Sequence, residues 1–381
     1  MTQKSLYIGL LSGTSVDSID VAVCEISNNS FSVKATHSHP IDSDIKKNLH
    51  ALIANQNSSI KDLGELNRKL GILFAQAVNT ILKQNNLKAT DITAIGFHGQ
   101  TIFHQPQPPY NFSWQLGCAN SLTEQTQIPV VTDFRQRDMI NNGQGAPLAP
   151  VFHEQVFKKP GINRAIVNIG GISNISLLVE QSSEQNFIGT DVGPGNTLLD
   201  LYYRKNHSNS TQDFDKNGEW AQSGTVNEHL LAELLADSYF KKPWPKSTGR
   251  EYFNLAWLDA HLSKLSLALQ PADIQRTLLE LTATIIADSV ISYNQSNSQY
   301  KISEVYLCGG GAHNKLLFAR ISELLAPVSV NKTDVLNIPA DWVEAALFAW
   351  LGYCTWNKQK LKLNHITGNK NSETMLGCVY F

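Results

Sequence analysis

Two stretches of the chain share one pattern, and this repeat constrains the fold more than any other feature. Residues 7–26 read YIGLLSGTSVDSIDVAVCEI, an apolar run, a turn of small polar residues and a second run of alternating β-branched residues. Residues 164–180, RAIVNIGGISNISLLVE, repeat the order of apolar run, small-residue turn and apolar run. Apolar runs bounded by turn residues predict buried strands. The repeat therefore predicts two β-hairpins, one in each half of a duplicated chain.

Helical patterns alternate with strand patterns along the chain. Apolar residues at spacings of three and four predict a long helix over about 60–82. Further strands are expected at residues 92–97, 129–131 and 303–311. Further helices are expected at roughly 194–204, 273–293, 313–325 and 342–356. This alternation is typical of an α/β protein, and Gly and Pro interrupt it near 141–150, between the two apparent copies.

Charge and cysteine usage exclude several classes of function. A formal net charge of −2, without clusters of Lys and Arg, gives no general attraction for nucleic acid or an anionic membrane. The five cysteines are scattered and form no CxxC pair, which argues against a zinc site or a disulfide framework. The apolar run at residues 6–11 is too short for a signal peptide or a membrane span. We therefore expect a cytoplasmic protein with neither nucleic-acid nor membrane partners.

Four glycine-rich turns adjoin the predicted strands: SGTSVDSID (12–20), NIGGISN (168–174), GTDVGPGN (189–196) and CGGGAHN (308–314). Any one of them could be a tight connection that requires positive φ. Together they favour nucleotide binding, because a turn without bulky side chains lets backbone N–H groups approach an anion. The sequence has no P-loop motif, and its glycines do not complete GxGxxG. We infer two phosphate-binding hairpins, an acidic catalytic turn and a nucleoside-binding turn.

Three aspartates lie in or beside these turns. Phosphoryl transfer without a P-loop lysine needs bound Mg²⁺ and a base that positions the nucleophile. Asp17 and Asp20 belong to the first hairpin, where local acceptance from the backbone is the alternative role. Asp191 is held among glycines and a proline ahead of a predicted helix, which favours a bound anion or a polarised oxygen there.

Three further side chains are candidates for binding a substrate. In AIGFHGQTIFHQP (94–106), His98 and Gln100 are expected just past a strand end, where ligands bind in open α/β sheets. A structural histidine is the alternative for His98. Glu344 either completes a capping box begun by Asp341 or faces a ligand from a helix start.

With these segments assembled, the sequence resembles the anhydro-N-acetylmuramic acid kinases of bacterial cell-wall recycling. The resemblance covers nearly the whole chain and rests on eight ordered motifs: GLLSGTSVDSID (9–20), GFHGQTIFHQP (96–106), TDFRQRD with GQGAPLAP (132–138, 143–150), NIGGISN, GTDVGPGN, PWPKSTGREYF (243–253), LCGGGAHN (307–314) and DWVEAALFAWL (341–351). The family usually has Gly where this chain has Ser18 and Asn142.

The resemblance implies a two-domain α/β fold of the actin/hexokinase/Hsp70 type, with duplicated domains and an interdomain ATP cleft. The first domain would contain residues 1–135 and be completed by 341–381, and the second would contain 136–340. The expected partner is a small amino sugar, and a homodimer is left open.

The family's reaction converts 1,6-anhydro-N-acetylmuramic acid, ATP and water to N-acetylmuramic acid 6-phosphate and ADP. By similarity, Asp191 would be the base that activates water, and Asp17 or Asp20 would orient Mg²⁺, possibly through water. The residues expected to bind ATP are Gly13, Thr14, Ser15, Val16, Asp17, Ser18, Ile19, Asp20, Gly171, Gly309, Gly310 and Gly311. The residues expected to bind the sugar are His98, Gln100, Asn174 and Glu344.

Two rival functions fit the same features. A plain sugar kinase would use Asp191 to deprotonate a free hydroxyl and would need no anhydro bond. An actin-like or chaperone-like ATPase would turn over ATP without sugar or form filaments, although no separate peptide-binding domain is apparent in the sequence.

Overall fold

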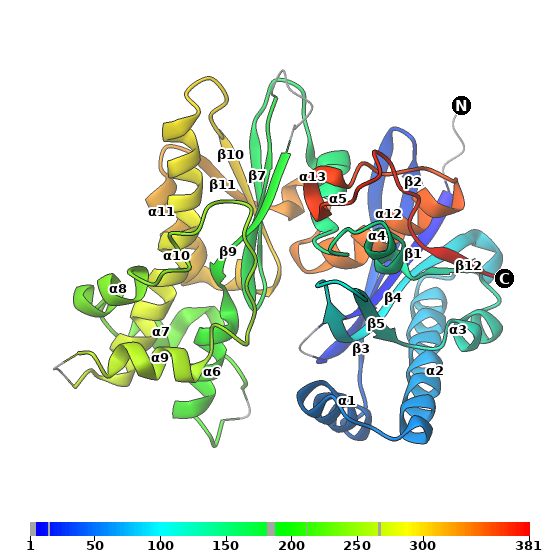
Figure 1. Ribbon diagram of the computed structural model, residues 1–381, viewed down its shortest axis with the longest axis horizontal. Helices are drawn as coiled ribbons and strands as arrows, with labels where there is room; N and C mark the ends of the chain where they lie inside the picture. The colour runs from blue at the N-terminus through cyan, green and yellow to red at the C-terminus, as the bar shows by residue number, and fades with distance from the viewer. Residues whose placement is uncertain (1–4, 14–15, 181–186, 211, 266–267) are drawn as a thin grey trace. The chain divides into compact units, whose positions relative to one another are not determined.

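The computed structural model divides the chain into two compact units (Figure 1). It describes residues 5–13, 16–180, 187–210, 212–265 and 268–381. Unit 1 contains Met1–Phe152 and Trp342–Phe381, and unit 2 contains His153–Asp341. Unit 1 thus continues past residue 135, as far as Phe152, and the C-terminal segment belongs to it.

Unit 1 is built on a sheet that, within the described residues, has seven strands in the order β12-β6-β4-β1-β2-β3, with β5 paired to β4. The first strand is antiparallel to β2 and parallel to β4, and β6 is parallel to β4. The strands are β1 (Ser5–Ser12), β2 (Ser18–Ser27), β3 (Ser30–Pro40), β4 (Ile92–Gln105), β5 (Phe112–Leu116), β6 (Val130–Thr132) and β12 (Cys378–Tyr380).

Unit 2 repeats this arrangement. In the described part of the chain its sheet has the order β11-β10-β7-β8-β9, and β7 is antiparallel to β8 and parallel to β10. The strands are β7 (Arg164–Ile169), β8 (Ile172–Leu178), β9 (Phe187–Pro194), β10 (Glu304–Cys308) and β11 (Ser329–Lys332). Each of these strands corresponds in order and direction to one of β6-β4-β1-β2-β3, so the predicted α/β class and the duplication are confirmed.

Helices pack on both sheets. In unit 1 they are α1 (Ser43–Asn55), α2 (Ile60–Gln84), α3 (Ala119–Thr126), α4 (Phe134–Ile140), α12 (Val343–Trp356) and α13 (Asn364–Thr367), with α5 (Ala149–Phe157) at the boundary. In unit 2 they are α6 (Asn196–Asn206), α7 (Glu219–Gln222), α8 (Glu228–Leu235), α9 (Leu255–Leu262), α10 (Pro271–Ser296) and α11 (Lys315–Leu325). Among the described residues, no helix is both long and apolar enough to cross a membrane.

The two largest helices of unit 1 bury different kinds of surface. Helix α2 has one apolar face, and its Phe74 meets Phe97 of β4 edge to face at a centroid distance of 4.8 Å. Helix α12 is buried almost all round. Its backbone lies directly on the sheet, because a Cβ on Gly9 of β1 would collide with the Ala345 carbonyl and one on Gly96 of β4 with the Phe348 carbonyl. These glycines set how closely the C-terminal helix approaches the sheet.

Two local predictions are wrong. His98 and Gln100 do not lie past a strand end, because β4 continues to Gln105. A bulge and the left-handed Gly99 (φ 80°) turn the strand, and its second half is then paired by β5. Asp191 lies within β9 instead of in a turn, because β8 supplies ladder partners as far as Pro194.

Replacement of Gly96 by alanine tests the contact between α12 and the sheet. We expect Gly96→Ala to lower the free energy of unfolding by about 1–3 kcal/mol, because the added methyl meets helix backbone that cannot rotate away. Denaturant unfolding followed by circular dichroism measures the change. The matched control is Gly64→Ala in α2, where a Cβ meets nothing within 4 Å, and it should stabilise by about 0.5–1 kcal/mol. Equal stability of Gly96→Ala and wild type would contradict this packing.

Candidate active site

A row of polar side chains crosses three adjacent strands of unit 2. Asn168 of β7 lies opposite Asn174 of β8, which in turn lies opposite Asp191 of β9. Directly opposed residues project from the same face of a sheet, and all three are half-buried. The structure therefore brings together the predicted Asn174 and Asp191 and adds Asn168. The sequence signal for Asn168 is its place at the start of the NIGGISN turn.

A segment that runs beside β9 forms hydrogen bonds with Asp191. The Thr248 N–H donates to Asp191 Oδ2 at 3.1 Å, and the Asp191 N–H donates to the Lys246 carbonyl at 3.0 Å. Burial raises the pKa of Asp191 to about 6, and the negative charge of Glu251 adds to the rise, whereas the Thr248 hydrogen bond opposes it. A carboxyl with this pKa is ionised at neutral pH and can still take up a proton, as a general base must.

Two of the predicted glycine turns of unit 2 lie against each other. The N–H groups of Gly195 and Thr197 donate to the Gly171 carbonyl at 2.9 and 3.1 Å, which joins the β7–β8 turn to the start of α6. A Cβ on Gly171 would lie 2.7 Å from Thr197 Oγ1 and 2.8 Å from Arg250 Nε. The hydroxyls of Ser173 and Thr197 are buried and have no hydrogen-bond partner among the described residues. These two hydroxyls and the nearby Arg250 guanidinium could donate hydrogen bonds to an anionic group.

The third glycine turn lies next to the start of α6. Gly309 has φ 78°, and Gly311 packs so closely that its Cβ would lie 2.9 Å from Asn196 Oδ1. A Cβ added at Gly310 would lie 3.9 Å from Asn196 Nδ2. The residues predicted to lie near the nucleotide in unit 2, Gly171 and Gly309–Gly311, are thus neighbours around Asn196. Arg250 and Asn196 are additions that the motifs GTDVGPGN and PWPKSTGREYF contained but did not single out.

The β1–β2 hairpin of unit 1 has its own tight turn. The N–H of Val16 donates to the Gly13 carbonyl at 3.0 Å, and Val16 is buried with φ 57°. Thr14 and Ser15, predicted to bind ATP, lie outside the described residues. Ser18 and the buried Ile19 begin β2.

The two aspartates of this hairpin have different surroundings. Asp17 is exposed and forms an ion pair with Lys46 at 2.7 Å. Asp20 is half-buried in β2 and accepts from Ser18 Oγ at 3.0 Å and Ser38 Oγ at 3.3 Å. Carboxylates of this kind suit Mg²⁺, which binds proteins through one or two of them and completes its shell with waters and phosphates.

Two buried polar side chains of unit 1 lie side by side, one at the end of β1 and the other within β4. Ser12 and Gln100 are paired in the parallel register and are 2% and 0% exposed. Gln100 Nε2 donates to the Thr101 carbonyl at 3.1 Å. Gln100 Oε1 and Ser12 Oγ have no hydrogen-bond partner among the described residues. Such a pair can donate and accept at a ligand, and Ser12 is a site residue that the sequence reasoning missed.

His98 holds an arginine. Its ring is buried, Arg135 Nε donates to His98 Nε2 at 3.0 Å, and the ring Nδ1 lies 3.1 Å from the Gly99 carbonyl. Burial and the Arg135 charge keep the pKa of His98 well below its usual range, so the ring is neutral with its proton on Nδ1. Burial lowers the pKa of Arg135 to about 10, while the charges of Glu344 and Asp138 act against this shift.

The capping box predicted for Glu344 is wrong. Helix α12 begins at Val343, its N-cap is Trp342, and no side chain caps it. The Asp341 carboxylate instead lies 2.8 Å from His313 Nε2. Glu344 is exposed on the first turn of α12, with Arg135 near enough for their charges to interact.

The duplicated α/β units, the glycine turns beside strands and the half-buried Asp191 together suit an enzyme of phosphoryl transfer. The family model described as anhydro-N-acetylmuramic acid kinase matches residues 5–381. Curated proteins of that name include one from Photobacterium profundum, 44% identical over 98% of this chain and 98% of its own length, and one from Coxiella burnetii, 44% identical over 99% and 98%. A third, from Pasteurella multocida, is 43% identical over 98% and 96%.

The chain belongs to the anhydro-N-acetylmuramic acid kinase family. It is therefore a kinase that uses ATP and transfers a phosphoryl group to an alcohol oxygen of a small-molecule substrate.

Removal of the Asp191 charge should stabilise the protein. The folded-state pKa of about 6 lies above the unfolded value, so ionisation costs the folded state stability as pH rises from about 4 through 6. Asp191→Asn keeps an acceptor for Thr248 and does not titrate. We expect it to be more stable than wild type at pH 8, on the order of 1–3 kcal/mol, with the difference shrinking towards pH 4.5. Thermal unfolding at both pH values measures this, and a pH-independent difference would refute it.

Proposed function

We propose that this enzyme opens 1,6-anhydro-N-acetylmuramic acid hydrolytically and phosphorylates its O6, giving N-acetylmuramic acid 6-phosphate and ADP in the recycling of peptidoglycan. The observation that carries the proposal is Asp191, whose burial raises its pKa to about 6 in the same unit as the buried hydroxyls of Ser173 and Thr197, which have no hydrogen-bond partner among the described residues. Membership of the family supports this substrate. Because this recycling consumes ATP, we place the enzyme in the cytoplasm.

The substrate determines what the base must do. A 1,6-anhydro sugar has no O6 hydroxyl to deprotonate, so a water must attack the anomeric carbon. Asp191 takes a proton from that water as its oxygen bonds to the anomeric carbon, and the bond from this carbon to O6 breaks with its electron pair on O6. O6 then bonds to the γ-phosphorus, and the bond from that phosphorus to the β–γ bridging oxygen breaks to release ADP. A plain sugar kinase would use Asp191 on a hydroxyl and would leave water unused.

The nucleotide is assigned to the glycine turns of each unit. In unit 2 we assign the nucleotide to the turns of Gly171 and Gly309–Gly311, with Ser173, Thr197 and Arg250 as donors to phosphate oxygens. In unit 1 we assign the turn from Gly13 to Asp20 to the ATP phosphates. Asp20 suits Mg²⁺ better than Asp17, because Asp17 is exposed and paired with Lys46. Bound Mg²⁺ would neutralise charge on the phosphate oxygens.

The sugar is assigned to polar groups that lack partners or carry charge. Gln100 and Ser12 offer a buried acceptor and hydroxyl in unit 1, while Asn174 lies beside Asp191 in unit 2. His98 acts on the sugar through Arg135 rather than directly, because both ring nitrogens lie within hydrogen-bond reach of partners in unit 1. We assign the substrate carboxylate to Arg135, whose planar guanidinium suits a carboxylate. Glu344 stays a candidate ligand for the sugar.

Product analysis in isotopically labelled water tests the function. After incubation with ATP, Mg²⁺ and 1,6-anhydro-N-acetylmuramic acid in ¹⁸O-water, we expect a ring-opened, phosphorylated sugar that carries ¹⁸O on its anomeric carbon. Mass spectrometry of the product and its fragments locates the label. An unchanged anhydro sugar with enzyme that is folded and binds ATP would refute the proposal and favour the plain sugar kinase.

The role of Asp191 is tested by separating turnover from nucleotide binding. Asp191→Asn should lower kcat at least about a hundredfold, because it removes the general base, while the Kd for ATP stays close to that of wild type. Calorimetric titration with ATP and a coupled ADP assay give the two quantities. The matched control is Asp288→Asn on the exposed side of α10, which should change neither. Near wild-type turnover in Asp191→Asn would show that another group is the base.

A further inference from the structure

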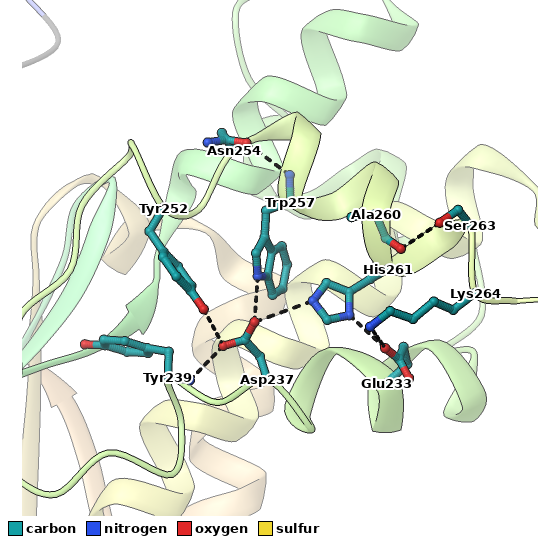
Figure 2. Close-up of polar contacts among 10 residues, drawn as sticks. All are labelled: Glu233, Asp237, Tyr239, Tyr252, Asn254, Trp257, Ala260, His261, Ser263 and Lys264. Carbon is teal, nitrogen blue, oxygen red and sulfur yellow. Dashed lines mark hydrogen bonds and ion pairs between the residues drawn. The ribbon is translucent and has the colours of Figure 1, made fainter.

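A buried carboxylate in unit 2 gathers hydrogen bonds from two stretches of chain (Figure 2). Asp237, just after α8, is 10% exposed and accepts at Oδ1 from the Tyr239 N–H at 2.7 Å and the Tyr252 hydroxyl at 2.8 Å. Its Oδ2 accepts from Trp257 Nε1 at 2.9 Å. One carboxylate therefore joins the turn after α8 to the turn before α9 and to α9 itself.

Charged neighbours complete this cluster. The His261 ring lies between two carboxylates, with Nε2 3.6 Å from Asp237 Oδ2 and Nδ1 3.0 Å from Glu233 Oε1. Lys264 Nζ donates to the same Glu233 oxygen at 2.6 Å. Burial raises the pKa of Asp237, but the hydrogen bonds from Tyr239, Trp257 and Tyr252 outweigh it and hold that pKa below the usual value. Asp237 is therefore an ionised acceptor at neutral pH.

Residues 243–248 run between the two stretches that Asp237 joins, and they lie against the strand that carries Asp191. The Asp191 N–H donates to the Lys246 carbonyl, and the Thr248 N–H donates to Asp191 Oδ2. Lys246 Nζ donates back to the Tyr239 carbonyl at 3.0 Å. The Tyr239 hydroxyl donates to the Asp191 carbonyl at 3.0 Å. The segment therefore meets Asp191, and the chain on either side of it is bound by Asp237, at Tyr239 before it and at Tyr252 and Trp257 after it.

We propose that Asp237 is a positioning residue for Asp191: by tying the chain before residues 243–248 to the chain after them, it fixes the Thr248 N–H against the Asp191 carboxylate. A segment with anchored ends loses less conformational entropy when its middle docks than a free loop does. The N–H of Thr248 is then a preorganised donor, and little further reorganisation of the chain is needed when the Asp191 carboxylate is ionised. This inference rests on the proposed function, in which Asp191 is the base.

The groups that face Asp191 give the sign of the effect. Burial and the charge of Glu251 raise the pKa of Asp191, and the Thr248 hydrogen bond lowers it. The neutral Tyr239 hydroxyl donates to the backbone carbonyl of Asp191 and not to the Asp191 carboxylate. Lys246 directs its ammonium to the Tyr239 and Phe240 carbonyls. Loosening of the segment removes the Thr248 donor and leaves the groups that raise the pKa.

Tyr252→Phe is the first test, because it removes one anchoring hydrogen bond and no charge. We expect the acid limb of the pH profile of kcat/KM to move up from near 6 by about half a pH unit or more, with kcat reduced. A ¹³C NMR titration of aspartate carboxyls in the full-length enzyme, with Asp191 assigned from Asp191→Asn, should show the same rise without relying on catalysis.

Asp237→Asn is the second variant, and its sign separates positioning from electrostatics. Loss of a negative charge alone would lower the pKa of Asp191, whereas loss of the Thr248 donor raises it. Lys264→Met is the matched control, since Lys264 touches only the Glu233 side of the cluster and should leave the Asp191 titration unchanged.

Each outcome decides the inference. A raised pKa for Asp191 in both Tyr252→Phe and Asp237→Asn, with Lys264→Met unchanged, supports positioning. If the NMR pKa rises but the kinetic limb does not follow, positioning holds and the base role of Asp191 fails. An unchanged or lowered NMR pKa in folded Tyr252→Phe overturns the inference, even if that variant melts at a lower temperature, because lower stability alone reports only a structural role.

Discussion

The register in which the first strand of each unit pairs with its neighbours fixes where several of the candidate site residues lie. In unit 2, Asn168 of β7 is opposite Asn174 on one side and Cys308 on the other. The turn after β7 and the glycine turn after β10 therefore emerge at the same edge, and β9 carries Asp191 to the next place in the row. A slip of one residue would turn these side chains to the other face. In unit 1 the corresponding register places Ser12 beside Gln100.

Asp191 shows how opposing terms tune one group. Burial alone would favour the protonated acid, which cannot act as a base, whereas full exposure would leave the carboxylate too weakly basic. Partial burial beside Glu251, with a single N–H from Thr248, leaves the pKa near 6. The resulting proton affinity depends on one backbone donor, and that donor belongs to a segment outside the sheet. The placement of residues 243–248 therefore affects the proton affinity of Asp191.

The sequence predicts the strands and helices that have strong periodicity, and it predicts the duplication. The hairpins at residues 7–26 and 164–180 and the long helix from Ile60 show apolar patterns that depend only on local burial. Strand β3 is missed because, at the sheet edge, it is mostly half-buried and lacks a clear alternation. The length of β4 is missed because it depends on pairing with β5, and the place of Asp191 depends on pairing with β8.

Candidate site residues follow the same division. Asp191 and Gly171 are recognisable because small residues surround them in the sequence, whereas Ser12, Arg135 and Asn168 gain their significance from neighbours distant in the sequence. Glu344 illustrates how a local rule fails: the spacing from Asp341 fits a capping box, but His313 takes the Asp341 carboxylate. A capping hydrogen bond contributes only about 1 kcal/mol, so one partner from another part of the fold is enough to displace it.

In unit 1 the buried His98 orients Arg135, and in unit 2 we infer that Asp237 orients the segment that binds Asp191. In both cases the orienting group must keep one protonation state. His98 can accept from Arg135 Nε only while its ring is neutral, and burial beside the guanidinium enforces that state. Asp237 accepts most strongly from both of its anchored stretches while it is ionised, and its donors favour that state in turn. In each case the orienting group is held away from its own titration near neutral pH. Asp191 is then left free to change protonation in that range without disturbing the groups that hold the site.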